Sequence, residues 1–147
     1  MRFLVAGLNY RTASTELLER VAVNDRHLPD LLLKLHRQLG EALVLSTCNR
    51  TEVYTTGEDF AVERERLMQA LGDMSDLTET EIAEVAYVYG GDEAIRHAIR
   101  VTCGLDSMVI GEHQIAGQVQ TALRAAGEAG SVDTPLSRLF HFALRSS

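Results

Sequence analysis

The sequence predicts a mixed α/β (α+β) domain with a ferredoxin-like, split β-α-β-β-α-β arrangement, followed by a helical segment that leads into a long connecting helix. Three observations support this fold class. Short apolar or alternating runs, typical of strands, occur near the start, in the middle and near residue 87. Longer stretches with helical spacing separate them, and after Asp92 the pattern stays helical.

Each element has its own local signal. Residues 2–8 form a compact apolar run, and leucines recur at helical spacing from Leu28 to Leu39 before Gly40 ends the pattern. Only residues 47–50 separate the two middle strands, so these four residues form a tight connection at a sheet edge. The expected elements, in chain order, are a strand over 2–8, helices over 12–21 and 28–39, strands over 42–46 and 51–56, a helix over 58–71, a strand over 85–89, and helices over 93–103, about 113–128 and from 134.

The helical half suggests a chain that continues. Asp92 can cap the helix after it, and Thr134-Pro135 places a cap and a first-turn proline at the start of the last helix. The apolar stripe of that helix runs up to Ser147 without a glycine, a proline or a cap, as expected for a fragment of a longer protein. We therefore expect a ferredoxin-like catalytic subdomain over 1–91, its helical part over 92–133 and the start of a connecting helix over 134–147.

Composition excludes several classes of protein. The 147 residues carry a net charge of −7, which is incompatible with a generic polybasic binder of nucleic acid or membrane. From Glu58 to Glu93 there are eleven acidic and two basic residues, a balance of −9, so the rest of the chain carries +2. No apolar run approaches the ~20 residues that span a bilayer, and two cysteines are too few for a disulfide framework. We expect a cytoplasmic protein without a membrane partner.

Cys48 is the first candidate for chemistry. It follows a buried strand, and the nearby guanidinium of Arg50 favours the thiolate form that attacks a carbonyl carbon. The alternative is a small buried hydrophobic residue, which is the commoner role of a lone cysteine. Cys103, on an expected helix among apolar residues, fits that buried role better.

A second candidate segment spans residues 104–118. Ser107, Glu112, Gln114 and Gln118 supply hydrogen-bonding side chains near a helix start, where a small polar ligand could bind; the alternative is a capped junction between two helices. His97, on the preceding helix, could act as a general acid or base, or be an ordinary solvated histidine. Metal-binding Cys-x-x-Cys and His-Glu-x-x-His pairs and the glycine-rich loops that hold nucleotides do not occur in the sequence.

Three separated motifs resemble glutamyl-tRNA reductase. They are Gly7-Leu8-Asn9-Tyr10-Arg11-Thr12-Ala13, the run Leu45-Ser46-Thr47-Cys48-Asn49-Arg50-Thr51-Glu52-Val53-Tyr54, and Gly104-Leu105-Asp106-Ser107-Met108-Val109-Ile110-Gly111-Glu112 followed by Gln114-Ile115. The similarity spans the chain but covers only the family's N-terminal catalytic domain and the start of its connecting helix. The family's NADPH-binding and dimerisation domains would follow Ser147. The sequence departs from the family pattern at His113, where proline is usual, and at Thr102-Cys103, where small residues are usual.

The resemblance implies a mechanism. Cys48 matches the nucleophile that attacks the aminoacyl ester of glutamyl-tRNA and holds glutamate as a thioester, which NADPH reduces in the full-length enzyme to glutamate-1-semialdehyde for tetrapyrrole (5-aminolevulinate, porphyrin, heme) biosynthesis. His97 matches a histidine important for activity. The residues that match substrate-binding positions are Thr47, Asn49, Arg50, Ser107, Glu112, His113, Gln114 and Gln118. By the same resemblance the full-length enzyme is a homodimer and a possible partner of glutamate-1-semialdehyde aminomutase.

Two functional hypotheses follow. In the first, this fragment carries out the acyl-transfer half of the reductase, without bound cofactor or metal. In the second, it is a non-catalytic ferredoxin-like module that binds RNA or a protein partner. Net charge −7 and only eight Phe and Tyr residues disfavour a stacking RNA platform, whereas Cys48 together with Arg50 favours the enzyme.

Overall fold

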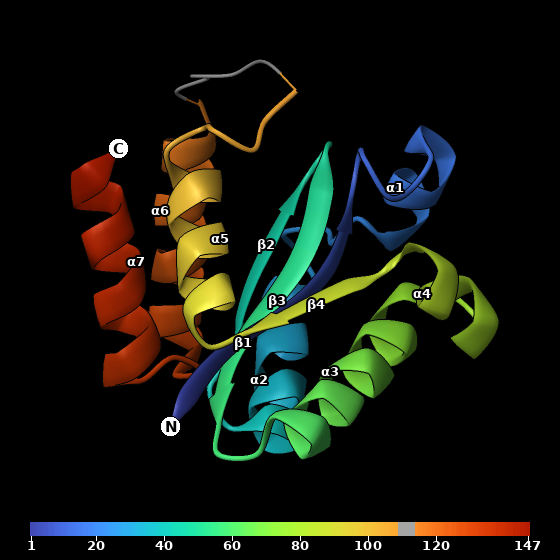
Figure 1. The fold of residues 1–147 in the computed structure, drawn as a ribbon, viewed down its shortest axis with the longest axis horizontal. Coiled ribbons are helices and arrows are strands. Elements are labelled where there is room, and N and C mark those ends of the chain that lie inside the picture. Colours follow the sequence, from blue (N-terminus) through green and yellow to red (C-terminus); the bar gives the residue numbers. More distant parts are fainter. Residues whose placement is uncertain (109–113) are drawn as a thin grey trace.

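Four antiparallel strands form the centre of the protein. The computed structural model describes residues 1–108 and 114–147, and within them no helix combines the length and the hydropathy needed to cross a membrane. The sheet order is β2-β3-β1-β4, which confirms the predicted split arrangement of strands (Figure 1). The elements are β1 (Arg2–Asn9), α1 (Thr15–Val21), α2 (Leu28–Leu39), β2 (Leu43–Thr47), β3 (Arg50–Gly57), α3 (Phe60–Ser75), α4 (Glu79–Val85), β4 (Tyr87–Gly90), α5 (Asp92–Thr102), α6 (Gln114–Ala129) and α7 (Thr134–Ser146).

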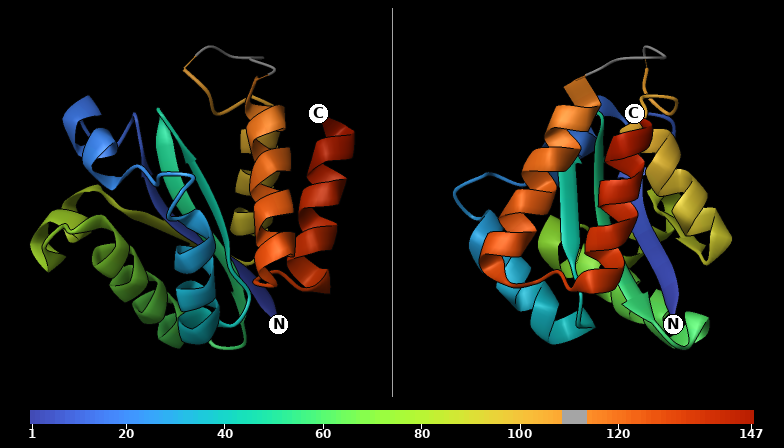
Figure 2. Two further views of the ribbon diagram at one scale, coloured as in Figure 1. Left: turned by 180° about the vertical axis from the view of Figure 1, so that it is seen from behind. Right: turned by 90° about the vertical axis from the view of Figure 1, so that its left-hand side faces the viewer.

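Helices cover both faces of the sheet. Figure 2 shows α1 to α4 on one side and α5 to α7 on the other. Leu4, Ala6 and Leu8 pack into the core with the first set, whereas Val5 packs with the second. Because both faces of β1 are buried, its sequence is a continuous apolar run rather than an alternation of apolar and polar residues.

The second crossover differs from the prediction. The sequence predicts one helix ending at Leu71 and a strand starting at Val85, but α3 continues to Ser75, and α4 follows after Asp76, whose φ of 59° is left-handed. A complete capping box starts α4, in which Thr78 and Glu81 exchange side-chain and backbone hydrogen bonds. As a result β4 starts two residues later than expected.

Two predicted helix caps were also misplaced. Asp92 is the first residue of α5 and makes no side-chain cap bond, since Gly91, at a φ of 64°, takes the cap position. In α7 the cap is Asp133, whose side chain accepts from the Thr134 N–H group, and Pro135 occupies the first turn as expected. The division of the chain at residues 91 and 133 stays a prediction, and α5, α6 and α7 all pack on the same sheet.

Candidate active site

Cys48 lies in a two-residue turn between β2 and β3. Thr47 pairs with Arg50 across the hairpin, so Cys48 and Asn49 form its loop. The Asn49 N–H group donates to Thr47 Oγ1 over 3.1 Å, and the Asn49 carbonyl accepts from the Tyr10 N–H group over 2.9 Å. One hydrogen bond thus lies within the turn, and another attaches the turn to Tyr10, directly after the end of β1. Cys48 is exposed and carries a free thiol, so it is not the small buried hydrophobic residue that the sequence left open as the alternative.

Arg50 is buried beneath this turn, with 2% of its surface exposed. Its Nη1 atom donates to Glu52 over 3.3 Å, and its Nη2 atom donates to the Asp106 carbonyl over 2.6 Å and to the Asp106 carboxylate over 3.1 Å. Burial works against the charge, but the carboxylates of Glu52 and Asp106 raise the pKa of Arg50 above its ordinary value. Arg50 therefore joins β3 to the segment after α5 as a permanent, buried cation.

Glu52 is the centre of the cluster and is fully buried. Besides Arg50, its carboxylate accepts hydrogen bonds from the hydroxyl of Tyr54 over 2.8 Å, from the hydroxyl of Tyr87 over 2.5 Å and from His97 Nε2 over 2.5 Å. Burial alone would raise the pKa of Glu52, but the hydrogen bond and charge of His97, the charge of Arg50 and the hydrogen bond from Tyr87 lower it to about 2.

The ionised Glu52 fixes the tautomer of His97. A carboxylate without a proton can only accept, so His97 Nε2 carries the hydrogen that lies between them. The remaining ring nitrogen, Nδ1, is then the atom that can take up or release a proton. Burial and the charge of Glu52 raise the pKa of Tyr54 and of Tyr87, so both phenols stay protonated as donors.

The other predicted site residues lie in two separate places. Ser107 is buried beside Asp106, and Asp106 also accepts from Arg11 Nη1 over 2.6 Å. Gln114 and Gln118 line a groove of about 550 Å³ between α6, the free edge of β2 and the segment that contains Val23. Predicted residues Glu112 and His113 lie outside the described part of the chain.

Several members of the cluster were missed at the sequence level. They are Arg11, Glu52, Tyr54, Tyr87 and Asp106. One signal could have found Glu52, because residues 50, 52 and 54 of an alternating strand point to the same face, and a charged pair on a buried face requires partners. In the described residues, no group of three or more His, Cys, Asp or Glu side chains could hold a metal ion.

The fold and site together define a class of protein: an antiparallel α/β domain with an accessible thiol above a buried Arg-Glu-His cluster. The profile of the family described as "Glutamyl-tRNAGlu reductase, N-terminal domain" matches residues 6–147. The chain belongs to this family.

Individual relatives agree with the family profile. The chain is 44% identical over 142 residues to glutamyl-tRNA reductase of Ectopseudomonas mendocina, covering 95% of this chain and 33% of the relative, and 44% identical over 147 residues to that of Frankia casuarinae, covering 99% and 31%. The solved structure of glutamyl-tRNA reductase from Methanopyrus kandleri superposes with a TM-score of 0.77 at 31% identity, over 97% of this chain and 32% of that one. The chain thus spans about a third of the length of the curated relatives it matches.

Proposed function

We propose that this chain performs the acyl-transfer step of glutamyl-tRNA reduction, with Cys48 as the nucleophile. The observation that supports this most strongly is the exposed thiol of Cys48 in a fixed turn, two residues before the buried Arg50. An aminoacyl ester is already activated, so a thiolate needs no strong base beside it to react.

The step transfers the glutamyl group from the ribose of the tRNA to the sulfur of Cys48. The Cys48 thiol gives up its proton, and its Sγ atom bonds to the ester carbonyl carbon. The bond between that carbon and the ribose oxygen of the tRNA breaks, the oxygen takes a proton, and glutamate remains as a thioester on Cys48. Since Glu52 holds His97 through Nε2, Nδ1 of His97 is the atom we assign to proton transfer.

Arg50 is the proposed selector of glutamate. Its Nη2 atom already binds one carboxylate, that of Asp106, and Arg11 binds the same group. Because Arg50 is buried and already paired, the carboxylate of glutamate would replace that of Asp106 on this guanidinium, and the amide of glutamine would be the weaker partner there. Replacing Arg50 by Lys removes the planar fork, so we expect the kcat/KM for glutamyl-tRNA to fall at least tenfold. Unchanged kinetics would rule out this role for Arg50.

The described residues do not fit a nicotinamide dinucleotide. The sheet is wholly antiparallel and lacks the β-α-β unit with a glycine-rich turn that binds such cofactors. We assign no hydride step to this chain, although the activity proposed for the full-length reductase uses NADPH. The proposed product of the chain alone is free glutamate, formed by hydrolysis of the thioester. The cytoplasmic location, the homodimer and the partnership with glutamate-1-semialdehyde aminomutase are proposals for the full-length protein.

Deacylation of glutamyl-tRNA tests the proposal. Wild-type protein is expected to release tRNA and free glutamate faster than the uncatalysed rate, and Cys48→Ser to abolish that excess. Cys103→Ser is the matched control, since it removes the other thiol, and should retain the activity. Equal rates for wild type and Cys48→Ser would refute the nucleophile. Formation of semialdehyde when NADPH is added would refute the restriction to acyl transfer.

A further inference from the structure

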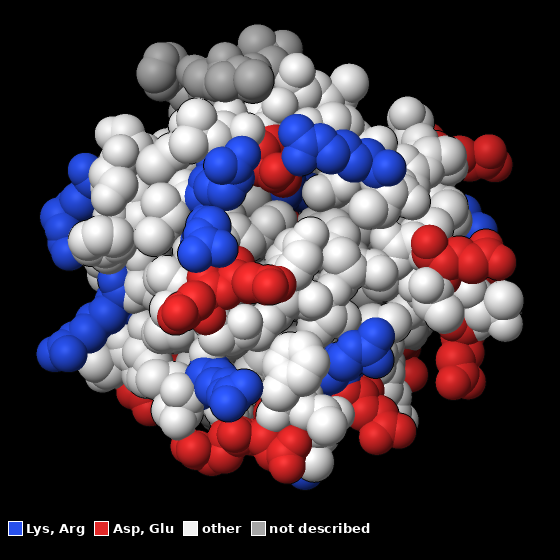
Figure 3. Space-filling model, in the orientation of Figure 1, with Lys and Arg blue, Asp and Glu red and all other residues white. Residues whose placement is uncertain are grey.

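Basic side chains lie next to the buried cluster, on the exposed side of α5. Arg96 and Arg100 are both exposed and are one helical turn apart, so they lie on the same side of the helix. Neither forms an ion pair with another described residue. Figure 3 shows basic side chains over α5, beside a hollow in this face of the molecule. His97 of the same helix reaches Glu52 within the cluster.

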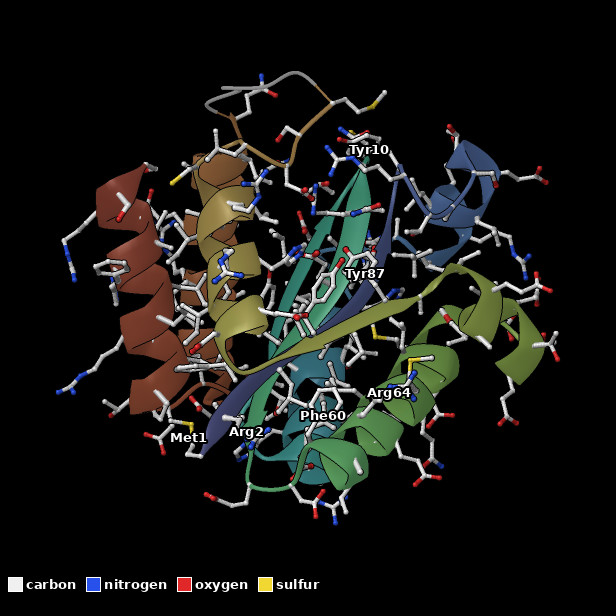
Figure 4. All side chains as sticks on the ribbon, viewed as in Figure 1. Met1, Arg2, Tyr10, Phe60, Arg64 and Tyr87 are labelled. Atoms are coloured by element: carbon white, nitrogen blue, oxygen red, sulfur yellow. The ribbon has the colours of Figure 1, made fainter. Side chains whose placement is uncertain are left out.

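Two tyrosine rings of β4 lie against α5 at His97. The rings of Tyr87 and Tyr89 on β4 are stacked, with centroids 5.3 Å apart and planes 23° from parallel. The His97 ring lies 5.0 Å from Tyr89 and 5.5 Å from Tyr87. Tyr87, labelled in Figure 4, is tied to Glu52 by its hydroxyl, whereas Tyr89 lies nearer the surface. The three rings thus form one compact group in which the His97 ring is tilted against both tyrosines, and Tyr89 is the less buried of the two tyrosines.

The charge along α5 changes sign toward the site. Asp92 and Glu93 begin the helix, and Glu93 lies one turn before Arg96. The two arginines therefore lie in the C-terminal half of α5. This half leads directly to Asp106, and the Leu105 N–H group bonds to the Arg100 carbonyl. An anion approaching the cluster along this half meets two guanidinium groups and one aromatic ring.

We propose that Arg96, Arg100 and Tyr89, called here the α5–β4 surface, bind the unpaired 3′ end of the tRNA. Backbone phosphates contact the two arginines, and an unstacked base lies on the Tyr89 ring. Single-stranded nucleic acid is held in this way because every base has a face that stacks and every linkage carries a negative charge. The inference rests on the proposed function, which requires the esterified end of the tRNA to reach Cys48.

Salt-dependent binding of uncharged tRNA tests this surface. We expect Arg96→Gln/Arg100→Gln to bind about tenfold more weakly than wild type at 0.1 M salt, and its slope of log affinity against log salt to be smaller by about 1 to 2. The matched control is Arg37→Gln/Arg64→Gln, which makes the same charge change on exposed residues of α2 and α3 in the opposite helical layer. Its affinity should stay within about twofold of wild type.

Two further measurements distinguish base stacking on Tyr89 from charge attraction, and tRNA binding from the reaction of Cys48. Tyr89→Phe keeps the ring and should bind tRNA like wild type, whereas Tyr89→Leu should bind about tenfold more weakly. A small α-ester of glutamate without RNA should acylate Cys48 equally fast in wild type and in Arg96→Gln/Arg100→Gln.

The outcomes distinguish the two proposals. If Arg96→Gln/Arg100→Gln binds tRNA with the affinity and salt dependence of wild type, the proposed role of the α5–β4 surface is wrong. This holds even if Cys48 reacts with both glutamyl-tRNA and the small ester. If this variant binds tRNA more weakly but wild-type protein reacts with neither glutamyl-tRNA nor the small ester, the result supports the α5–β4 surface and refutes the acyl-transfer function. A loss of reaction with the small ester in the double variant also overturns the inference, because it would place the arginines in the chemistry rather than in RNA binding.

Discussion

Glu52→Gln tests the buried cluster most directly. The carboxylate accepts four hydrogen bonds, two of them from Arg50 and His97, and no part of it reaches solvent. Glutamine keeps the shape but removes the charge, and its amide group places a donor against donors. Breaking one partner of a buried ion pair typically costs about 3–5 kcal/mol. We therefore expect the free energy of unfolding to fall by about 3–5 kcal/mol.

The pKa of Glu52 leads to a similar magnitude. A decrease from 4.5 to about 2 corresponds to roughly 3 kcal/mol of stability, at about 1.4 kcal/mol per unit. Because the folded-state pKa is the lower one, this stability is present above the unfolded-state pKa and is lost as the pH falls from about 4.5 toward 2. Glu52→Gln should lack this part of the acid-induced loss.

Urea denaturation at pH 7 and along a series from pH 5 to pH 3 measures both effects. Glu65→Gln on α3 is the matched control, since Glu65 is exposed, and its free energy of unfolding should stay within about 0.5 kcal/mol of wild type. If Glu52→Gln unfolds within 1 kcal/mol of wild type at pH 7 and shows the same pH dependence, the cluster does not hold the site together as described.

Three further variants test local parts of the structure. In Gly7→Ala, the new Cβ would lie 2.5 Å from the Thr51 carbonyl oxygen, so we expect a loss of about 1–3 kcal/mol in urea denaturation; a stability equal to wild type would contradict this close strand contact. Tyr87→Phe removes one donor from the buried Glu52 and should cost about 1.5–3 kcal/mol by the same method, with a neutral effect arguing against the hydrogen bond. Thr78→Ala removes the cap of α4 and should lower the free energy of unfolding by about 1 kcal/mol while Thr78→Ser does not; equal losses in both would contradict the capping role.

The succession of strands and helices could be predicted from the sequence because the local signals agree with the fold. β1 is buried on both faces and therefore forms an unbroken apolar run, and the short β2–β3 connection requires a hairpin. α4 was missed because it is short: only one of its seven residues is buried, so it shows no apolar stripe at helical spacing. Its strongest sequence signal is the four-residue capping box that begins at Thr78.

The site was predicted only in part, because its partners are far apart in the chain. Arg50 and Cys48 lie in one motif, but Asp106 and His97 come from the segment 45 or more residues later. Only packing of α5 on the sheet brings them to β3. The alternation of β3 could have indicated Glu52, but no local pattern shows that Arg50 binds Asp106, so Asp106 emerged only from the structure.

The central claim is that Cys48 becomes acylated by glutamate, and intact mass measurement tests it most directly. The protein is incubated with glutamyl-tRNA, quenched in acid and weighed beside Cys48→Ser and Cys103→Ser. We expect an adduct of one glutamyl group on wild type and Cys103→Ser and none on Cys48→Ser. An adduct that persists in Cys48→Ser, or the absence of both adduct and released glutamate in wild type, would contradict it.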